Sequence, residues 1–172
     1  MLQPAVNNKD HIQGSLSSPV ILVEYGDFQC PHCRAAHPHV KMLIKHFGDK
    51  IGFVFRHFPL SEIHPMALGA ALTAEAADNK GKFWEMYDAI FDQQELLEEG
   101  LPGLQLIIRS VGLNPGETEK EWTDKGITAK VNDDFESGIL SGVNGTPSFF
   151  INGTKYNGAY DFSSMEKAIQ KI

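Results

Sequence analysis

The apolar positions of the chain follow two periods, and together these predict an α/β fold. Residues 19–25 form a run of β-formers with the apolar residues Val20, Ile21, Leu22 and Val23, which is typical of a central strand buried on both faces. From 31 to 47 the apolar residues recur on one helical face, and Gly48 follows as a stop signal. Residues 51–58 are strand-like again, so this part of the chain predicts a right-handed βαβ unit with parallel strands.

The middle of the chain, residues 61–140, has the periodicity of successive helices. Apolar residues recur at helical spacing over 65–79, 83–91 and 104–111, and a further helical stretch follows a break at Asn114-Pro115-Gly116. Aromatic residues at this spacing belong to a core more often than to a cofactor pocket. We therefore assign them to packing.

The end of the chain changes character again. Two short strand-like runs, 148–151 and 154–156, flank Asn152-Gly153, which is the strongest short signal for a β-hairpin. A closing helix is predicted after the hairpin. Ser163 and Glu166 have the spacing of a capping box at its start.

Length and composition indicate one globular domain. The chain has 172 residues, of which 42% are hydrophobic, and this is enough to build a core without a disulfide framework. Residues 1–18 are polar and have no sustained period, so we interpret them as a leading arm. The domain is then expected to span residues 19–172.

Charge and hydropathy exclude two classes of partner. The net charge is -7, with +2 over residues 1–60 and -9 over 61–172, and no basic patch indicates nucleic acid. No apolar run approaches the length of about 20 residues that a membrane span needs. The first ten residues lack the regions of a secretory signal, so we expect a cytoplasmic protein, although a periplasmic chain whose signal had been removed would look the same.

The two cysteines of the chain stand in the motif Cys30-Pro31-His32-Cys33, directly after the buried strand and at the start of a helix. This is the setting in which a C-x-x-C sequence indicates a redox pair. The spacing brings the two sulfurs within disulfide distance, and the free N–H groups and dipole of a helix start stabilise a thiolate at Cys30. Pro31 suits the first helical position, where its missing N–H costs nothing.

Two other interpretations of the cysteines are possible. A structural zinc site could combine Cys30 and Cys33 with His37 or His39, but such sites usually have four Cys or His ligands, and no second C-x-x-C is present. The pair could also be buried and inert. A strand-to-helix junction, where side chains reach the surface, argues against that.

Three further residues are candidates for roles around the cysteines. His32, if charged, would lower the pKa of Cys30 and make the disulfide more oxidising. Glu24 lies in the apolar strand, where it is either a buried carboxyl with a raised pKa that exchanges a proton with Cys33 or a strand-end carboxylate that reaches water. Pro147, on sequence alone, is a residue at the entry of a strand.

The other histidines near these motifs show no sequence pattern that indicates a catalytic role. Isolated histidines are more often surface groups or hydrogen-bonded core groups than catalytic ones. We therefore leave His37, His39, His57 and His64 out of the candidate site.

In combination, these segments resemble the DsbA-like thiol-disulfide oxidoreductases of the thioredoxin superfamily. The resemblance runs from about Pro19 to the C-terminus. Its segments, in order, are the strand with Glu24, then Phe28-Gln29-Cys30-Pro31-His32-Cys33, Phe55-Arg56-His57-Phe58-Pro59, a helical insert, and Gly145-Thr146-Pro147-Ser148-Phe149-Phe150-Ile151-Asn152-Gly153. Threonine rather than valine precedes Pro147, and this departure leaves the direction of electron flow open.

The resemblance implies a thioredoxin-like fold, with βαβ and ββα halves at residues 19–60 and 141–172 and a helical insertion at 61–140. It also implies the roles of single residues. Cys30 would be the exposed nucleophile, Cys33 the resolving thiol and Glu24 a buried acid below them. Pro147 would be cis and would turn the backbone of Thr146 toward the sulfurs, where it could pair with a substrate strand.

We therefore expect an enzyme that exchanges disulfides with protein or peptide thiols. Its only redox group would be the Cys30–Cys33 disulfide, with no metal or separate cofactor, and an unidentified redox partner would reset it. A cytoplasmic reductase of disulfides, glutathione adducts or peroxides is the alternative, and a zinc- or peptide-binding module without turnover is a third possibility. The clients and the oligomeric state are left open.

Overall fold

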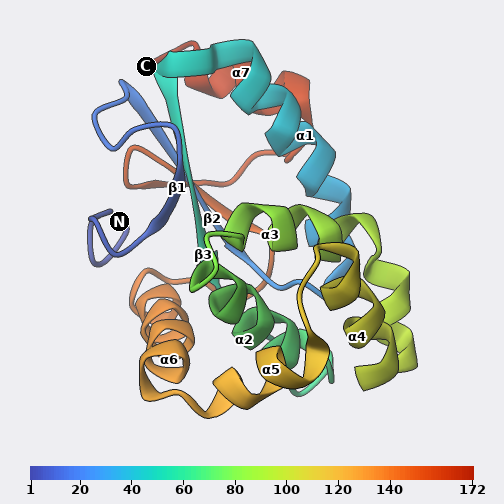
Figure 1. Ribbon diagram of the computed structural model, residues 1–172. Coiled ribbons are helices and arrows are strands. Elements are labelled where there is room, and N and C mark those ends of the chain that lie inside the picture. Colours follow the sequence, from blue (N-terminus) through green and yellow to red (C-terminus); the bar gives the residue numbers. More distant parts are fainter.

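The central sheet of this computed structural model, which describes residues 1–172, has five strands in the order β1-β3-β2-β4-β5 (Figure 1). The strands are β1 His11–Gln13, β2 Val20–Gly26, β3 Ile51–His57, β4 Ser148–Ile151 and β5 Thr154–Tyr156. Only β2 and β3 run parallel; the other neighbours are antiparallel. The predicted thioredoxin-like α/β architecture, with its parallel βαβ unit, is confirmed.

Helices cover the sheet and form the insert. They are α1 Pro31–Phe47, α2 Ala67–Asp78, α3 Phe83–Asp92, α4 Leu101–Ser110, α5 Pro115–Lys120, α6 Lys125–Leu140 and α7 Phe162–Ile169, with short 3-10 helices η1 Gly48–Lys50, η2 Gln94–Glu99 and η3 Glu121–Thr123. No helix combines the length and the apolar composition that a membrane crossing requires.

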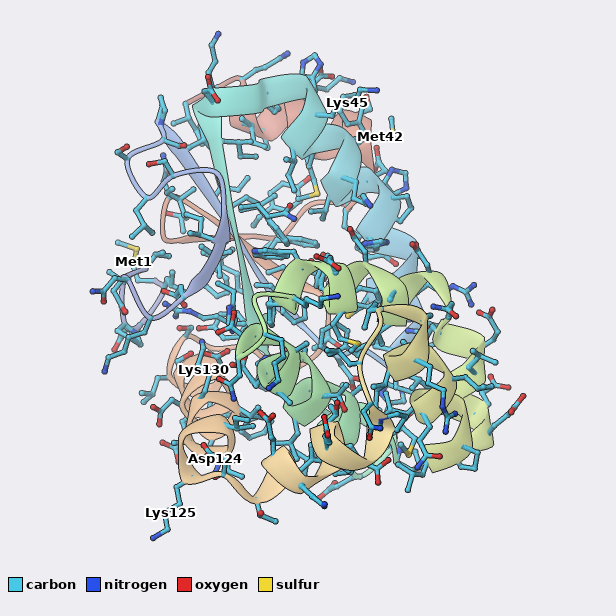
Figure 2. The ribbon with its side chains drawn as sticks, in the orientation of Figure 1. Met1, Met42, Lys45, Asp124, Lys125 and Lys130 are labelled. Atoms are coloured by element: carbon cyan, nitrogen blue, oxygen red, sulfur yellow. The ribbon has the colours of Figure 1, made fainter.

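The first helix has the bounds that its sequence predicts. Pro31 occupies the first turn, and Gly48 ends the helix with a positive φ of 51°. Val40 and Leu43 are buried against the core, whereas Met42 and Lys45 point away from the sheet on the outer side of α1 (Figure 2). This burial of one face fixes the helix and so the position of the cysteines at its start.

Alternation along β2 divides the core between the two faces of the sheet. Leu22 belongs to the large cluster formed with α1, α3, α4 and α7, and Glu24 shares its face by the period of two. Val23 and Tyr25 belong to a smaller cluster on the opposite face, which includes Phe58 and is lined by α6 and the N-terminal segment. The carboxyl of Glu24 therefore points into the larger core.

The hairpin at the end of the sheet is confirmed residue by residue. Strands β4 and β5 flank Asn152 and Gly153, whose φ values of 46° and 80° belong to a two-residue turn with positive φ at both positions. The predicted capping box is wrong, however. The N-cap of α7 is Asp161, whose carboxylate accepts the backbone N–H of Ser164.

Residues 1–18, expected to be a leading arm, instead contribute a strand. β1 adds antiparallel to β3 at the edge of the sheet, with His11 opposite Phe55. The guanidinium of Arg56 on β3 donates to both carboxylate oxygens of Asp10, at 2.8 and 3.0 Å, and both side chains are buried. Sequence periodicity missed this strand because three residues are too few to show a period.

Candidate redox site

The two cysteines lie where β2 gives way to α1. Cys30 is the N-cap residue of the helix, with extended backbone, and its N–H donates to the carbonyl of Asp27 at 3.0 Å. Cys33 follows in the first turn, and the backbone N–H of Asp27 donates to its sulfur at 3.5 Å. Both side chains are free thiols. The local sequence thus places two thiols in one turn at a helix start.

Cys30 is less accessible than the resemblance implies. Only 4% of Cys30 is exposed, and Cys33 is fully buried. The expectation of an exposed nucleophile is therefore wrong for this conformation, because the carbonyl of Thr146 lies 3.5 Å from the Cys30 sulfur. Cys30 is still the more accessible of the two thiols.

The two thiols differ in acidity. The hydrogen bond from the Cys33 thiol and the backbone N–H groups of Cys33 and His32 lower the pKa of Cys30 to about 5, against the opposing effect of burial. Burial, the hydrogen bond to Cys30 and the charge of Glu24 raise the pKa of Cys33 well above its ordinary value. At neutral pH the first proton therefore leaves from Cys30 and the Cys33 thiol keeps its own.

The side chain of His32 contacts the segment before α7. Its Nδ1 lies 3.2 Å from the hydroxyl of Tyr160, in the loop before α7. The group of His32 that lowers the pKa of Cys30 is the backbone N–H. A charge effect of the imidazole on Cys30 stays a prediction.

Thr146 and Pro147 complete the edge of the site. Their peptide bond is cis, and the Thr146 carbonyl accepts a hydrogen bond from the Cys30 thiol at 3.5 Å. The Thr146 hydroxyl is buried without a hydrogen-bond partner. The chain reverses direction after α6 to bring this segment, far away in sequence, onto the cysteines.

Glu24 lies below the pair, in the middle of the sheet. It is fully buried between its strand neighbours Phe55 on β3 and Phe149 on β4, and neither of its carboxyl oxygens has a hydrogen-bond partner. Burial, with a smaller contribution from the charge of Cys30, raises its pKa to about 8. The interpretation as a strand-end carboxylate in water is wrong, and the expected burial of Glu24 is confirmed.

The four residues considered as zinc ligands from the sequence, Cys30, Cys33, His37 and His39, do not form a cluster. His37 is on α1 but its Nε2 is paired with Asp88 on α3 at 2.8 Å. His39 accepts the backbone N–H of Phe162 through Nδ1. Neither imidazole faces Cys30 or Cys33.

Several residues of the site had no clear sequence signal. Gln94 is buried, and its side-chain N–H₂ donates to the carbonyls of Phe28 at 2.8 Å and Cys30 at 2.9 Å. Asp27 is buried and accepts hydrogen bonds from His64 and from the backbone of Leu60. Each contact joins the cysteine loop, residues 27–30 between β2 and α1, to a distant segment.

The chain resembles proteins of one family over almost its whole length. Residues 6–171 match the family model described as Thioredoxin. Among solved structures, DsbA2 of Pseudomonas aeruginosa is 28% identical with a TM-score of 0.78, covering 94% of this chain and 93% of that one. α-DsbA1 of Wolbachia pipientis is 25% identical with a TM-score of 0.81, covering 96% and 92%.

Curated relatives carry a different name. The Na(+)/H(+) antiporter NhaA 1 of Mycolicibacterium vanbaalenii is 35% identical over 170 residues, which are 99% of this chain and 28% of that protein. NhaA 1 of Salinispora arenicola is 36% identical over 98% of this chain and 26% of its own length. The chain thus spans about a quarter of the length of these relatives.

Proposed function

Because this chain belongs to the thioredoxin family and has the fold of its DsbA-like thiol-disulfide oxidoreductases, we propose that it exchanges disulfides with protein or peptide thiols through Cys30 and Cys33. One observation carries the proposal. The Cys30 thiol, at the start of α1, has a pKa lowered to about 5, while Cys33 beneath it keeps its proton. This asymmetry suits a pair in which one sulfur attacks or leaves and the other resolves.

The reaction begins with the Cys30–Cys33 disulfide. A substrate thiolate attacks the Cys30 sulfur, the bond to Cys33 breaks, and Cys33 leaves as a thiolate that takes up a proton. A second substrate thiolate then attacks the substrate sulfur of the mixed disulfide and releases Cys30 as a thiolate. The substrate loses two electrons and gains a disulfide, and the enzyme gains those electrons as a dithiol. An oxidising disulfide partner is required to reset it.

Glu24 is suited to supply the proton for Cys33. Its pKa of about 8 keeps the carboxyl protonated at neutral pH, and the rise in the pKa of Cys33 caused by Glu24 indicates that the two groups interact. A protonated acid beside a leaving thiolate assists the departure of that thiolate. We assign Glu24 the role of proton donor and acceptor for Cys33.

Thr146 and Pro147 are proposed to hold the substrate backbone beside Cys30. The Thr146 carbonyl already lies against the Cys30 sulfur, so an extended substrate chain that pairs with this segment would bring its own cysteine to Cys30. His32 and Pro31 would act through the backbone, by fixing the helix start.

The low pKa of Cys30 favours disulfide donation over reduction. A stabilised thiolate stabilises the reduced enzyme and makes the disulfide a stronger oxidant. We expect glutathione equilibration to place the reduction potential nearer the roughly -120 mV of strong oxidants than the roughly -270 mV of thioredoxin. A value near the latter would instead support the cytoplasmic reductase.

A trapping experiment tests the exchange itself. In Cys33→Ala the mixed disulfide at Cys30 has no resolving thiol, so incubation with a disulfide-bonded client peptide should give a covalent adduct that a reducing agent releases. Cys30→Ala is the matched control, since it retains one thiol but lacks the proposed nucleophile. Equal adduct in both variants, or none in either, would reject the assignment.

The transport activity in the names of the curated relatives is not proposed for this chain. The similarity covers about a quarter of those proteins, and it corresponds to the whole thioredoxin-like fold described above. The redox proposal therefore concerns this unit alone.

A further inference from the structure

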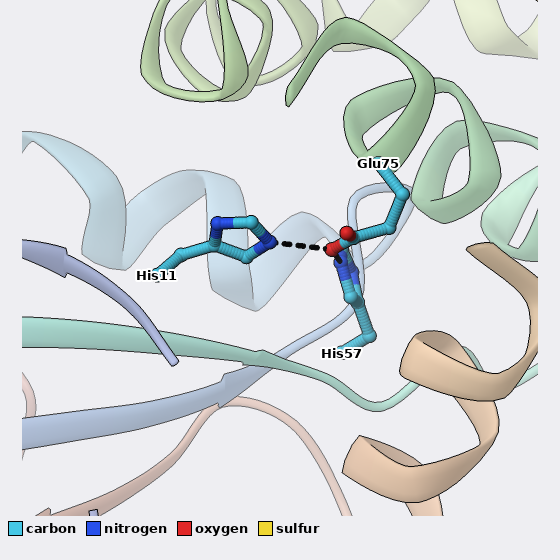
Figure 3. A group of neighbouring side chains, drawn as sticks. All are labelled: His11, His57 and Glu75. Carbon is cyan, nitrogen blue, oxygen red and sulfur yellow. Dashed lines mark hydrogen bonds and ion pairs between the residues drawn. The ribbon is translucent and has the colours of Figure 1, made fainter. Parts of the chain in front are cut away.

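Three side chains that play no part in the redox site meet at the C-terminal end of β3. His11 comes from β1, His57 from the end of β3 and Glu75 from α2, and Figure 3 shows both imidazoles directed at the one carboxylate. The Nε2 atoms of His11 and His57 each lie 2.7 Å from Oε1 of Glu75. The three ligand atoms all lie within 4.8 Å of one another.

The carboxylate of Glu75 lacks a permanent counter-charge. Its side chain is 6% exposed, and its ion-pair partners are the two imidazoles, with no Lys or Arg among them. A buried carboxylate is costly unless a cation neutralises it. Here the two imidazoles stabilise the carboxylate through hydrogen bonds, and a bound metal ion would neutralise its charge as well.

We propose that His11, His57 and Glu75 form a binding site for a divalent transition metal ion of the zinc class. Two imidazole nitrogens and one carboxylate oxygen are a ligand set that zinc prefers, and they differ from the all-oxygen sites of calcium and magnesium. Ligand atoms around a tetrahedral zinc ion lie about 3.3 Å apart, given metal–ligand bonds of about 2.0 to 2.2 Å. The two nitrogen–oxygen distances of 2.7 Å are shorter than this value, so the imidazoles would have to move apart from the carboxylate to admit an ion, and no two of the three ligand atoms are more than 4.8 Å apart.

The surroundings of His11 support a ligand role. When Nε2 binds a metal, the proton moves to Nδ1, and metal-bound histidines usually donate that proton to a carboxylate or carbonyl. Nδ1 of His11 lies 3.8 Å from a carboxylate oxygen of Asp78, which is an ion-pair distance and longer than a hydrogen bond. The ring also stacks on Phe83, with centroids 3.6 Å apart and planes 9° from parallel, which fixes its orientation.

The site is nearly closed, and His11 is the most exposed of its three residues. His57 is 1% exposed, whereas the His11 side chain is 10% exposed and lies on the edge strand. Three protein ligands leave a fourth position for water or for the second oxygen of Glu75. A bound ion would join β1, β3 and the helical insert, so its expected effect is on stability rather than on chemistry at the cysteines.

The test uses the full chain with Cys30→Ser and Cys33→Ser, because thiolates would otherwise bind zinc themselves. Titration with zinc chloride in a calorimeter should show one site per chain, and a hundredfold excess over the Kd should raise the Tm by roughly 5 to 10 °C. Cobalt should give the visible bands of a tetrahedral nitrogen and oxygen site without a thiolate charge-transfer band.

Substitution of the ligands locates the site. His11→Gln and Glu75→Gln should each lower the zinc affinity at least tenfold, whereas His46→Gln, at an exposed histidine paired with Glu166, should leave it unchanged. Circular dichroism checks that each variant is folded. If the cysteine-free parent, folded and with all three ligands present, shows neither a zinc-dependent rise in Tm nor cobalt bands, the proposal is overturned and the cluster is a hydrogen-bonded lock.

Discussion

The thiol of Cys30 donates a hydrogen bond to the backbone carbonyl of Thr146 at 3.5 Å, although 116 residues separate them in the chain. The contact brings the start of α1 against the segment that leads into β4. It therefore places the proposed nucleophile beside a main-chain edge that a substrate strand can use.

The difference in acidity between the two thiols predicts selective alkylation. In the reduced protein, iodoacetamide should react with Cys30 with a midpoint near pH 5, and Cys33 should stay unmodified at pH 7, because burial raises the pKa of Cys33. Mass spectrometry of quenched samples gives both rates. In denaturant both thiols should titrate near their ordinary value of about 8.5. A folded-state midpoint for Cys30 at that value would contradict the prediction.

The sequence predicted best what depends on local periodicity and short motifs. The bounds of α1, the hairpin at Asn152-Gly153 and the place of Cys30 at a helix start all follow from residues within one or two turns. Contacts such as Gln94 with the Cys30 carbonyl join residues 64 positions apart. These contacts depend on how the insert folds back over the sheet, and no local pattern encodes that.

The roles of isolated polar residues were predicted least well, because their partners are also distant in the sequence. His57 looked like an ordinary surface or core histidine, and its sequence neighbours gave no sign of its partners, His11 and Glu75. Glu24 was different, because a carboxyl within an apolar strand is unusual in itself. Its burial could be suspected from sequence, whereas its lack of hydrogen bonds needed the structure.

Glu24→Gln should remove a pH-dependent penalty on folding. The folded pKa of about 8 exceeds the ordinary 4.5, so the carboxyl costs nothing below pH 4.5, and stability then falls as the pH rises to about 8. At about 1.4 kcal/mol per pH unit, the penalty at pH 7 is roughly 3 kcal/mol. Urea denaturation of the reduced protein between pH 4.5 and 8 should show a flatter profile for the variant. Glu62→Gln, at an exposed position, is the control, and an unchanged slope in Glu24→Gln would refute the assignment.

Asp10→Ala should destabilise the fold strongly, because it leaves the guanidinium of Arg56 buried without its carboxylate. The two side chains are 4% and 3% exposed, and loss of one partner of such a pair costs about 3 to 5 kcal/mol. Arg34→Ala, which breaks the exposed pair with Glu95, should cost less than about 1 kcal/mol. Equal effects in equilibrium denaturation would show that residues 1–18 add little to the fold.

Gln94→Ala should destabilise the loop that carries the cysteines. The substitution removes the side-chain donor to the Phe28 and Cys30 carbonyls. The Cys30 carbonyl keeps the backbone N–H of Arg34 at 3.1 Å, whereas the Phe28 carbonyl is left without a donor, which costs about 1 to 3 kcal/mol. Gln170→Ala, at an exposed position near the C-terminus, should change stability by less than about 0.5 kcal/mol.

A second substitution at this position separates the hydrogen bonds from simple packing. Gln94→Glu has nearly the same shape, but an ionised carboxylate would face two carbonyl oxygens and could donate to neither. Its stability should therefore fall below that of Gln94→Ala at pH 7 and recover at pH 4, where the acid is protonated and can donate once. Urea denaturation of the two variants at both pH values, each compared with wild type, measures this. A Gln94→Glu protein as stable as wild type at pH 7 would mean that the amide does not hold the cysteine loop.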